Sequence, residues 1–434
     1  MAAMPPPSRL RGREIVCVGF ADWEADLWTN QQHLMSRLAR ENRVLFVESL
    51  GLRRPQLAGR DLRRISRRLR KGLRPPREVD GLHVLSPLVV PLHSHRAVRA
   101  LNRRLLRLQV RRATRRVGIG GTGEQLGGAG EQPGISSEQR PILWAYVPQA
   151  EALIDVLHPE LVVYHCVDDA AAVEGIDADS FRTAERRYVA QADLVLASAP
   201  ALAARMRELS ANVLYAPNVA DTALFTRALA PESAQPDPAT QPEHVAPDPA
   251  VAALPRPRIV FTGAVVAAKL DLPLLTRLAR LRPDWSLALV GPVGPGDPRT
   301  DVSMLRELPN IHLLGPRPYE RLPEVLCAAD AGLIPYAINS ITNSVFPMKV
   351  YEYLAAGLPV VATPLPALAD VSEVATAPDA QGIAALLERE LAADTPERRA
   401  ERSRAAAAHS WDRRLEEIAA AVRALPGKPA RGRA

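Results

Sequence analysis

The sequence predicts an α/β protein with two domains, each a parallel sheet covered by helices. Its 434 residues exceed what one hydrophobic core usually supports, and the 47% that are hydrophobic are enough for two cores. Short apolar segments alternate with helical patterns in both halves, as they do in parallel sheets. A stretch rich in Pro, Ala and Asp, residues 230–255, has no apolar face and is expected to be a disordered junction between the halves.

The alternating segments place one Rossmann-like domain at 12–225 and another at 256–408, followed by a helix at 409–425 and a basic tail at 426–434. The strands expected in the first domain are EIVCVGF, RVLFVES, PILWAYVP, ELVVYHCVD, DLVLAS and NVLYAPN. Those expected in the second are RIVFTGAV, SLALVGPV, IHLLGPR, AGLIPY and PVVAT. Two such domains bind ligands in the cleft between them, beyond the carboxyl ends of the strands, so functional side chains are expected in turns that follow strands.

A glycine-rich run, residues 118–137, interrupts the first domain without any hydrophobic period. It lacks the helix and the Lys-Ser/Thr pair that follow the glycines of a phosphate-binding loop. We therefore expect a flexible surface insertion there.

The positive charge is concentrated at the start of the chain. The whole chain carries a formal net charge of +7, while the residues up to Arg116 carry about +17. Apolar residues recur at helical spacing in both arginine clusters: Leu62, Ile65, Leu69 and Leu73 in the first, and Val98, Leu101, Leu105 and Leu108 in the second. Each cluster is expected to form an amphipathic helix, whose arginine face is either solvated or docks onto anionic lipid or an anionic acceptor.

The chain is expected to stay in the cytoplasm, peripherally on the inner face of the membrane if the arginine helices dock there. No apolar run approaches the length of a membrane span, and the N-terminus leads into a strand rather than a secretory segment. Cys17, Cys166 and Cys327 lie far apart in apolar segments, which is typical of reduced, buried thiols.

Two short patterns suggest metal ligands but do not form a site. His93 and His95 have no further ligand cluster near them in the sequence. Asp177 and Asp179 follow a Glu-Gly pair rather than an apolar run, which favours a solvated turn. No metal or cofactor is therefore expected.

The turn after the strand RIVF is a candidate anion site. Gly263 allows a ligand to approach the backbone, and a helix is expected to begin near Asp271, where free amides attract phosphate. Lys269 lies six residues beyond the glycine and can reach the same anion. The alternative is a purely structural glycine turn.

The second candidate is the segment SVFPMKVYEYLAAGLPVVAT. Pro347 can start a helix that Gly357 ends, and Lys349 and Glu352 lie one turn apart on it. A carboxylate there can accept hydrogen bonds from two ribose hydroxyls, and the ammonium can offset diphosphate charge. The alternative is an ordinary surface ion pair.

These segments together resemble a known enzyme family. FTGAV with Lys269, GLIPY and PMKVYEYLAAGLPVVAT are similar to the C-terminal half of the retaining GT-B glycosyltransferases of family 4, especially a bacterial branch for cell-surface polysaccharides such as teichuronic acid. DLWTNQQHLMSRLA, YHCVDD, ADLVLASAPAL and PNVADTALF extend the resemblance over the first half, so that it covers about 14–425. It implies a GT-B fold and transfer of a hexose-type sugar, with retention and without metal, from a nucleotide-diphosphate sugar to a glycan or lipid-linked acceptor.

The resemblance also implies roles for individual residues. Gly263 backs the donor diphosphate, Lys269 neutralises it, and Glu352 binds the nucleotide ribose. His165 matches the first-domain histidine that contacts the donor sugar. Asp168 and Asp169, which follow it, are placed to hold sugar or acceptor hydroxyls.

Two departures from the family pattern bear on donor binding. Ala264 stands where the family has arginine, and Ser344 stands where it has the first glutamate of a Glu, seven residues, Glu motif. These departures affect one phosphate contact and one sugar contact. Four nearby side chains can compensate: Asn339, Thr342, Asn343 and Lys349.

Three other functions remain as alternatives. A nucleotide-sugar epimerase of the same shape needs more acid and base groups than His165, Asp168 and Asp169 provide. A degenerate relative can act as a scaffold in a polysaccharide complex, given Ala264 and Ser344. Nucleic-acid binding would suit the arginines and the pI near 9.6, but no aromatic residues interleave them, so no nucleic-acid partner is expected.

Overall fold

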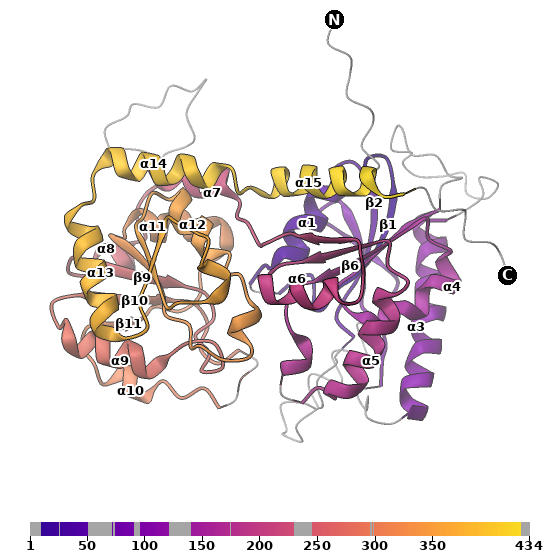
Figure 1. The fold of residues 1–434 in the computed structure, drawn as a ribbon, viewed down its shortest axis with the longest axis horizontal. Helices are drawn as coiled ribbons and strands as arrows, with labels where there is room; N and C mark the ends of the chain where they lie inside the picture. The colour runs from indigo at the N-terminus through magenta and orange to yellow at the C-terminus, as the bar shows by residue number, and fades with distance from the viewer. Residues whose placement is uncertain are drawn as a thin grey trace, which may run out of the picture. The chain divides into compact units, whose positions relative to one another are not determined.

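The fold is that of two α/β units, each with its own sheet. The computed structural model describes residues 10–25, 27–50, 72, 74–90, 96–120, 140–173, 175–229, 245–295, 297 and 299–426. Met1–Ala216 and Leu415–Ala434 form the N-terminal unit, and Pro217–Arg414 forms the C-terminal unit. The helices and strands of both units are labelled in Figure 1.

The N-terminal unit contains an eight-stranded sheet with the order β3-β4-β2-β1-β5-β6-β7-β8. Its strands are β1 (Glu14–Val18), β2 (Arg43–Val47), β3 (Arg77–Val79), β4 (Leu82–Leu85), β5 (Ile142–Ala145), β6 (Leu161–Cys166), β7 (Leu194–Ala197) and β8 (Val213–Tyr215). Neighbouring strands are parallel except β3 and β4, which form an antiparallel edge. Every residue of β1, β5, β6 and β7 is buried, because helices cover both faces of the sheet.

Two helices of the N-terminal unit begin at residues whose side chains cap them. They are α1 (Asn30–Ala39), α3 (Arg96–Val117), α4 (Ile154–Leu157), α5 (Ala178–Val189), α6 (Pro200–Arg207) and, from Leu415 onward, α15 (Trp411–Ala424). Thr29 and Gln32 form a capping box at α1. Asp177 caps α5 by accepting a hydrogen bond from the Ser180 amide, so the predicted turn at Asp177 is the start of a helix.

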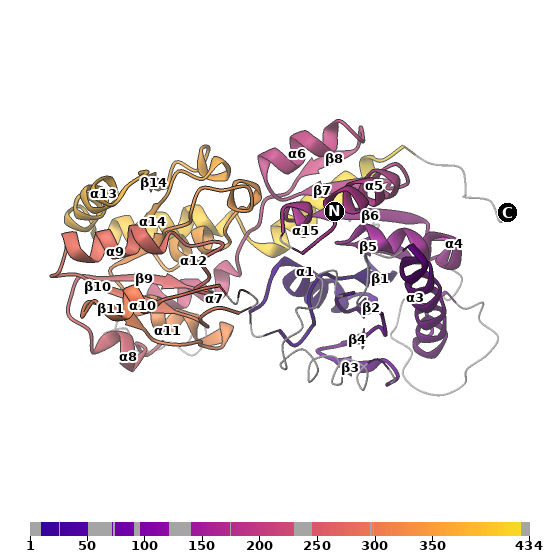
Figure 2. The ribbon, with the colours of Figure 1, turned by 90° about the horizontal axis from the view of Figure 1, so that it is seen from below.

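The C-terminal unit contains a six-stranded, fully parallel sheet with the order β11-β10-β9-β12-β13-β14. Its strands are β9 (Arg258–Thr262), β10 (Ser286–Val290), β11 (Ile311–Leu313), β12 (Ala331–Ile334), β13 (Val360–Ala362) and β14 (Val374–Thr376). Its helices are α7 (Thr222–Thr226), α8 (Pro249–Ala252), α9 (Leu272–Leu281), α10 (Ser303–Arg306), α11 (Leu322–Cys327), α12 (Lys349–Ala355), α13 (Ala380–Ala392) and α14 (Pro396–Ala407). Figure 2 shows this unit from a second side. The predicted two-sheet α/β fold is confirmed.

The domain boundaries differ from the sequence prediction. Residues 217–225, which were expected in the first domain, belong to the C-terminal unit, and the last helix returns to the N-terminal unit from Leu415 onward. The physical reason for the first shift is that α7 packs against α12 and α14 rather than against the first sheet.

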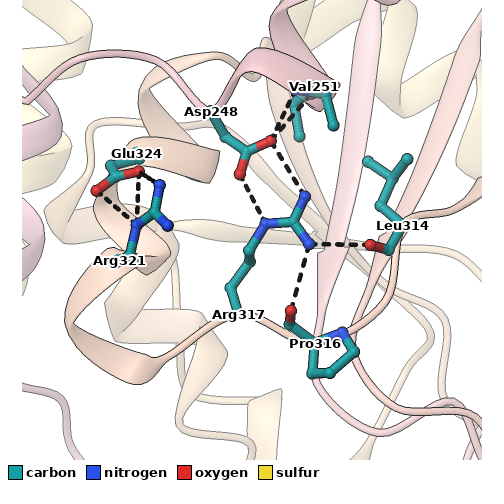
Figure 3. Close-up of polar contacts among 8 residues, drawn as sticks. Asp248, Val251, Leu314, Pro316, Arg317, Arg321 and Glu324 are labelled. Atoms are coloured by element: carbon teal, nitrogen blue, oxygen red, sulfur yellow. Dashed lines mark hydrogen bonds and ion pairs between the residues drawn. The ribbon is translucent and has the colours of Figure 1, made fainter.

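The predicted disordered junction is partly ordered. Val245 and Val251 are buried, and Asp248 caps the short helix α8 through the amides of Ala250 and Val251. The Asp248 carboxylate also accepts a hydrogen bond from Arg317, at 2.7 Å to Nε, as Figure 3 shows. This buried ion pair holds residues 245–255 against the unit, so the prediction was wrong there; residues 230–244 lie outside the described part.

The start of the glycine-rich insertion is packed rather than flexible. Ile119 is buried, the Gly120 amide donates to Glu14 Oε2 at 2.7 Å, and Arg43 donates to the Gly118 carbonyl at 2.8 Å. These contacts fix residues 118–120 to the sheet, contrary to the prediction. Residues 121–137 lie outside the described part of the chain.

Helix α3 confirms one predicted arginine helix, but its buried face is different. Leu101 and Leu108, expected to be buried, are 46% and 45% exposed, whereas Leu106 and Val110 are buried. Hydrogen bonds explain this rotation of the helix. The side chains of Asn102 and Gln109 lie on the inner face and form hydrogen bonds with backbone groups of the segment 88–90. The other predicted helix, 62–73, lies outside the described residues, Gly72 excepted.

The three cysteines are free thiols, as predicted, but not all three are buried. Cys17 and Cys166 are buried, while Cys327 is only partly so. Within the described ranges, no helix is both long and apolar enough to cross a membrane.

Candidate functional site

Two glycines bring the turns after β9 and β10 into direct contact. Gly263 has φ of +126°, and its amide donates to the Val290 carbonyl at 2.8 Å. A Cβ on Gly291 would lie 1.9 Å from the Gly263 carbonyl oxygen, so only glycine fits at 291. Because its amide is already bonded to the Val290 carbonyl, Gly263 does not offer the amide to a ligand.

Gly263 instead makes room for the ammonium of Lys349. Lys349 Nζ lies 2.9 Å from the position that a Cβ on residue 263 would occupy. The same ammonium lies over the rings of Phe261 and Tyr336, at 5.1 and 5.8 Å from their centroids. These cation–π contacts hold the charge at the carboxyl ends of β9 and β12.

Glu352 is buried close to that charge. It lies in the first turn of α12 and is only 5% exposed. Burial raises the pKa of this carboxyl to about 7, although the Lys349 ammonium and the Tyr319 hydroxyl oppose the rise. Near neutral pH the carboxyl is therefore divided between its protonated and ionised forms.

The connection from β9 to α9 carries Lys269 as its cation. The Lys269 side chain is half-buried, and its backbone carbonyl accepts a hydrogen bond from the Ala337 amide at 2.9 Å. The loop is held by Asn339, whose side chain donates to the Ala268 carbonyl at 3.1 Å. Lys269 is thus attached to a fixed backbone.

The N-terminus of α9 does not provide the predicted phosphate site. The Leu272 amide donates to the Leu270 carbonyl, Pro273 has no amide hydrogen, and the Leu274 amide donates to the Asp271 carboxylate at 2.7 Å. The first three positions therefore have no free amide, and Asp271 adds negative charge that repels an anion. The expectation of an anion-binding helix end was wrong at α9.

The segment before α12 forms a rigid polar loop. Asn339 Oδ1 accepts hydrogen bonds from the amides of Ile341 and Thr342 at 2.9 and 3.0 Å. Ser344 ends the following 3-10 turn and is buried. The Asn343 side-chain oxygen is buried and has no hydrogen-bond partner within the described residues. This oxygen therefore keeps its capacity to accept a hydrogen bond.

The three predicted residues of the N-terminal unit have different surroundings. His165 lies inside β6 and is 2% exposed, and its ring is stacked on that of Tyr146, with the ring centroids 4.9 Å apart. Asp168 is exposed beyond the strand. Asp169 pairs with Arg182 at 2.6 Å, which leaves it less available than predicted.

Tyr353 is a site residue that the sequence reasoning missed. Its hydroxyl accepts a hydrogen bond from the Thr262 amide at 2.7 Å and contacts Thr262 Oγ1 at 3.1 Å. Tyr353 thereby fixes the last residue of β9, directly before Gly263. Gly291 was also missed, although it shows the same strand-then-glycine pattern as Gly263.

Within the described residues, no group of three or more His, Cys, Asp and Glu side chains is arranged to hold a metal ion. His93 and His95 lie outside these residues.

Comparison with known sequences identifies the C-terminal unit. Residues 256–392 match the family model described as glycosyl transferases group 1. A curated relative, named as the teichuronic acid biosynthesis glycosyltransferase TuaH of Bacillus subtilis (strain 168), is 37% identical over 101 residues. The match covers 23% of this chain and spans about a quarter, 25%, of the relative.

Solved structures match almost the whole chain at low identity. HepE of Anabaena in complex with UDP and glucose is 14% identical, with a TM-score of 0.56 over 95% of this chain and 99% of that one. An Escherichia coli structure described as trehalose-6-phosphate bound with UDP-2-fluoro glucose is 11% identical, with a TM-score of 0.61 over 95% and 99%. Such likeness defines the fold. The chain has the GT-B fold, and within it residues 256–392 match the model of the glycosyl transferases group 1 family.

Proposed function

We propose that the protein is a glycosyltransferase that moves a hexose-type sugar from a nucleotide-diphosphate sugar to an acceptor, with retention and without a metal. The observation that carries this proposal is the ammonium of Lys349, which lies against Gly263 at the carboxyl ends of β9 and β12. Ligands of open α/β sheets bind at this end of the strands.

The two lysines have the charge that the reaction needs. When the bond from the sugar to the diphosphate breaks, negative charge grows on the leaving phosphate, and fixed cations stabilise it. Lys269 supplies one cation from the connection between β9 and α9, and Lys349 supplies the other from the first residue of α12. We infer that Lys349 replaces the arginine that family members have at the position of Ala264.

The neighbouring polar groups suit the rest of the donor. Glu352, when ionised, can accept hydrogen bonds from two ribose hydroxyls. Asn343 Oδ1 and the Ser344 hydroxyl can bind sugar hydroxyls where family members use a glutamate.

In the N-terminal unit, His165 is proposed to contact the donor sugar through a ring held by stacking. Asp168 and Asp169, the second of which also pairs with Arg182, would hold hydroxyls of the sugar or acceptor.

The similar proteins suggest the substrates. Structures of the same fold contain UDP and UDP-sugars, which supports a UDP-sugar donor. The similarity to TuaH supports a glycan or lipid-linked acceptor of the cell envelope. The free thiols of Cys17 and Cys166 support a reducing, cytoplasmic location, with the acceptor at the inner face of the membrane.

A thermal-shift screen against nucleoside diphosphates and nucleotide-sugars tests the donor, and release of UDP in the presence of membrane glycolipids tests the transfer. We expect a shift with UDP and UDP-sugars. Ala264 stands where family members have arginine, and Ser344 stands where they have glutamate. These two departures favour one other candidate function, that of a non-catalytic partner in a polysaccharide complex. A shift with UDP-sugars but no UDP release with any acceptor would support that candidate, and no shift at all would reject the donor site.

A further inference from the structure

Helix α3 has a firmly attached inner face. Its inner side chains Leu106 and Val110 are buried in the core of the N-terminal unit. Asn102 forms two hydrogen bonds of 2.8 Å with the backbone of Val90, and Gln109 bonds both backbone groups of Leu88. The rotation of the helix about its axis is therefore fixed, and so is the set of side chains that it presents outward.

The outward side of α3 combines exposed leucines with arginines. The helix contains nine arginines and no acidic residue. At 3.6 residues per turn, Leu101, Arg104, Leu108, Arg111 and Arg115 lie along one stripe, opposite the buried face. We call these five residues the outer stripe. All five are exposed, and Leu101 and Leu108 are among the most exposed large apolar side chains of the described residues.

The arginines of the outer stripe keep their charge as far as the described residues show. On the flank of α3, Arg107 pairs with Asp155 at 3.3 Å, and Arg103 lies 3.8 Å from Glu151. None of Arg104, Arg111 and Arg115 forms an ion pair with an acidic side chain of the described residues. The outer stripe therefore keeps an excess of positive charge that attracts an anionic surface.

We propose that the outer stripe of α3 binds the surface of a lipid bilayer that contains anionic lipids. The two leucines would enter the boundary between headgroups and acyl chains, while the arginines contact the lipid phosphates. A helix with a cationic face and apolar side chains suits this position in the interface. A nucleic acid or an acidic protein surface would also attract the arginines, but phosphates alone give no reason for two exposed leucines on the same stripe.

Sedimentation with vesicles tests the proposal. The full-length protein is mixed with vesicles of phosphatidylcholine, or of phosphatidylcholine with an equal amount of phosphatidylglycerol. We expect binding to the mixed vesicles. The variant Leu101→Ser/Leu108→Ser should bind on the order of tenfold more weakly, because two apolar side chains no longer leave water. The variant Arg104→Ala/Arg111→Ala/Arg115→Ala should lose about fivefold per arginine, on the order of a hundredfold in all.

A matched control removes three exposed arginines from other helices, Arg306→Ala/Arg404→Ala/Arg423→Ala, and should bind the mixed vesicles like the original protein. If this control lost as much vesicle binding as the Arg104→Ala/Arg111→Ala/Arg115→Ala variant, net charge alone would explain the binding. That result would overturn the proposal. So would undiminished binding of the leucine variant, which would indicate a general polyanion site. The thermal shift with UDP-sugars in the absence of vesicles should be unchanged in all variants, which separates this proposal from that for the donor site.

Discussion

Replacing Glu352 by glutamine should stabilise the protein only at neutral and alkaline pH. Burial raises the pKa of this carboxyl from its ordinary value of 4.5 to about 7. The folded protein therefore favours the protonated form, and the resulting stability is fully present below pH 4.5 and is lost as the pH rises through 7. Since each pKa unit corresponds to about 1.4 kcal/mol, ionisation of the buried carboxyl costs about 3 kcal/mol above pH 7.

Chemical unfolding at a series of pH values measures this effect. Glu352→Gln should match the original protein near pH 4.5 and become more stable by up to about 3 kcal/mol near pH 8, because glutamine cannot ionise. The control is Glu307→Gln, which changes an exposed carboxyl. Its difference in stability from the original protein should vary little with pH. A stability difference for Glu352→Gln that is the same at every pH would refute the raised pKa.

The same ionisation should control donor binding. If the ionised carboxylate holds the ribose, affinity for a UDP-sugar should rise about tenfold between pH 6 and pH 8, as ionisation of a group with a pKa near 7 becomes complete. A UDP-sugar is preferable to UDP, because its phosphates do not titrate in this range. Glu352→Gln should bind more weakly, and its affinity should not change with pH.

Three further changes test other parts of the site and fold. Lys269→Ala should lower turnover about a hundredfold, as expected for loss of an electrostatic stabiliser, without changing the melting temperature; UDP release and calorimetry measure the two. Gly263→Ala should destabilise the protein by about 1–3 kcal/mol, because residue 263 has a positive φ. It should also weaken UDP-sugar binding, because the new methyl group displaces the Lys349 ammonium. Unchanged binding would contradict the close approach of Lys349 to residue 263. Asp248→Ala should cost about 3 kcal/mol in unfolding experiments, because Arg317 loses its partner and α8 its cap; Asp248→Asn, which can still cap the helix, should cost less.

The strands of both sheets could be predicted because they are buried on both faces. Segments such as ILWA and SLALV contain side chains that suit the interior whichever way they point, so their pattern needs no knowledge of distant contacts. The antiparallel edge formed by β3 and β4 was missed. Both strands are short, and β3 is partly charged and never fully buried, so its sequence resembles a loop.

Long-range polar contacts explain the predictions that were wrong. The Pro- and Asp-rich composition of residues 245–255 indicates disorder, but Asp248 is held by Arg317, which lies 69 residues away. In α3, leucines at helical spacing indicated the buried face, whereas Asn102 and Gln109 fixed the helix in another rotation by bonding to the segment 88–90. Neither partner can be found from local spacing.

Within the candidate site, the sequence located the glycine turn after β9 but not the contacts that the turn makes. The strand-then-glycine pattern located Gly263, but the pattern does not show that the amide bonds to Val290 and that the missing Cβ leaves space for Lys349. Tyr353 was missed because it is one of several apolar residues on α12, and only its contact with Thr262 distinguishes it.

The proposed donor site is centred on the Lys349 ammonium, and calorimetric titration with a UDP-sugar tests this site directly. The original protein should bind at a single site, and Lys349→Met, which keeps the length of the side chain and removes its charge, should bind at least about tenfold more weakly while melting at a similar temperature. Equal binding by both proteins would show that Lys349 takes no part in holding the donor. Failure of the folded original protein to bind any nucleotide-sugar would contradict the proposed donor site altogether.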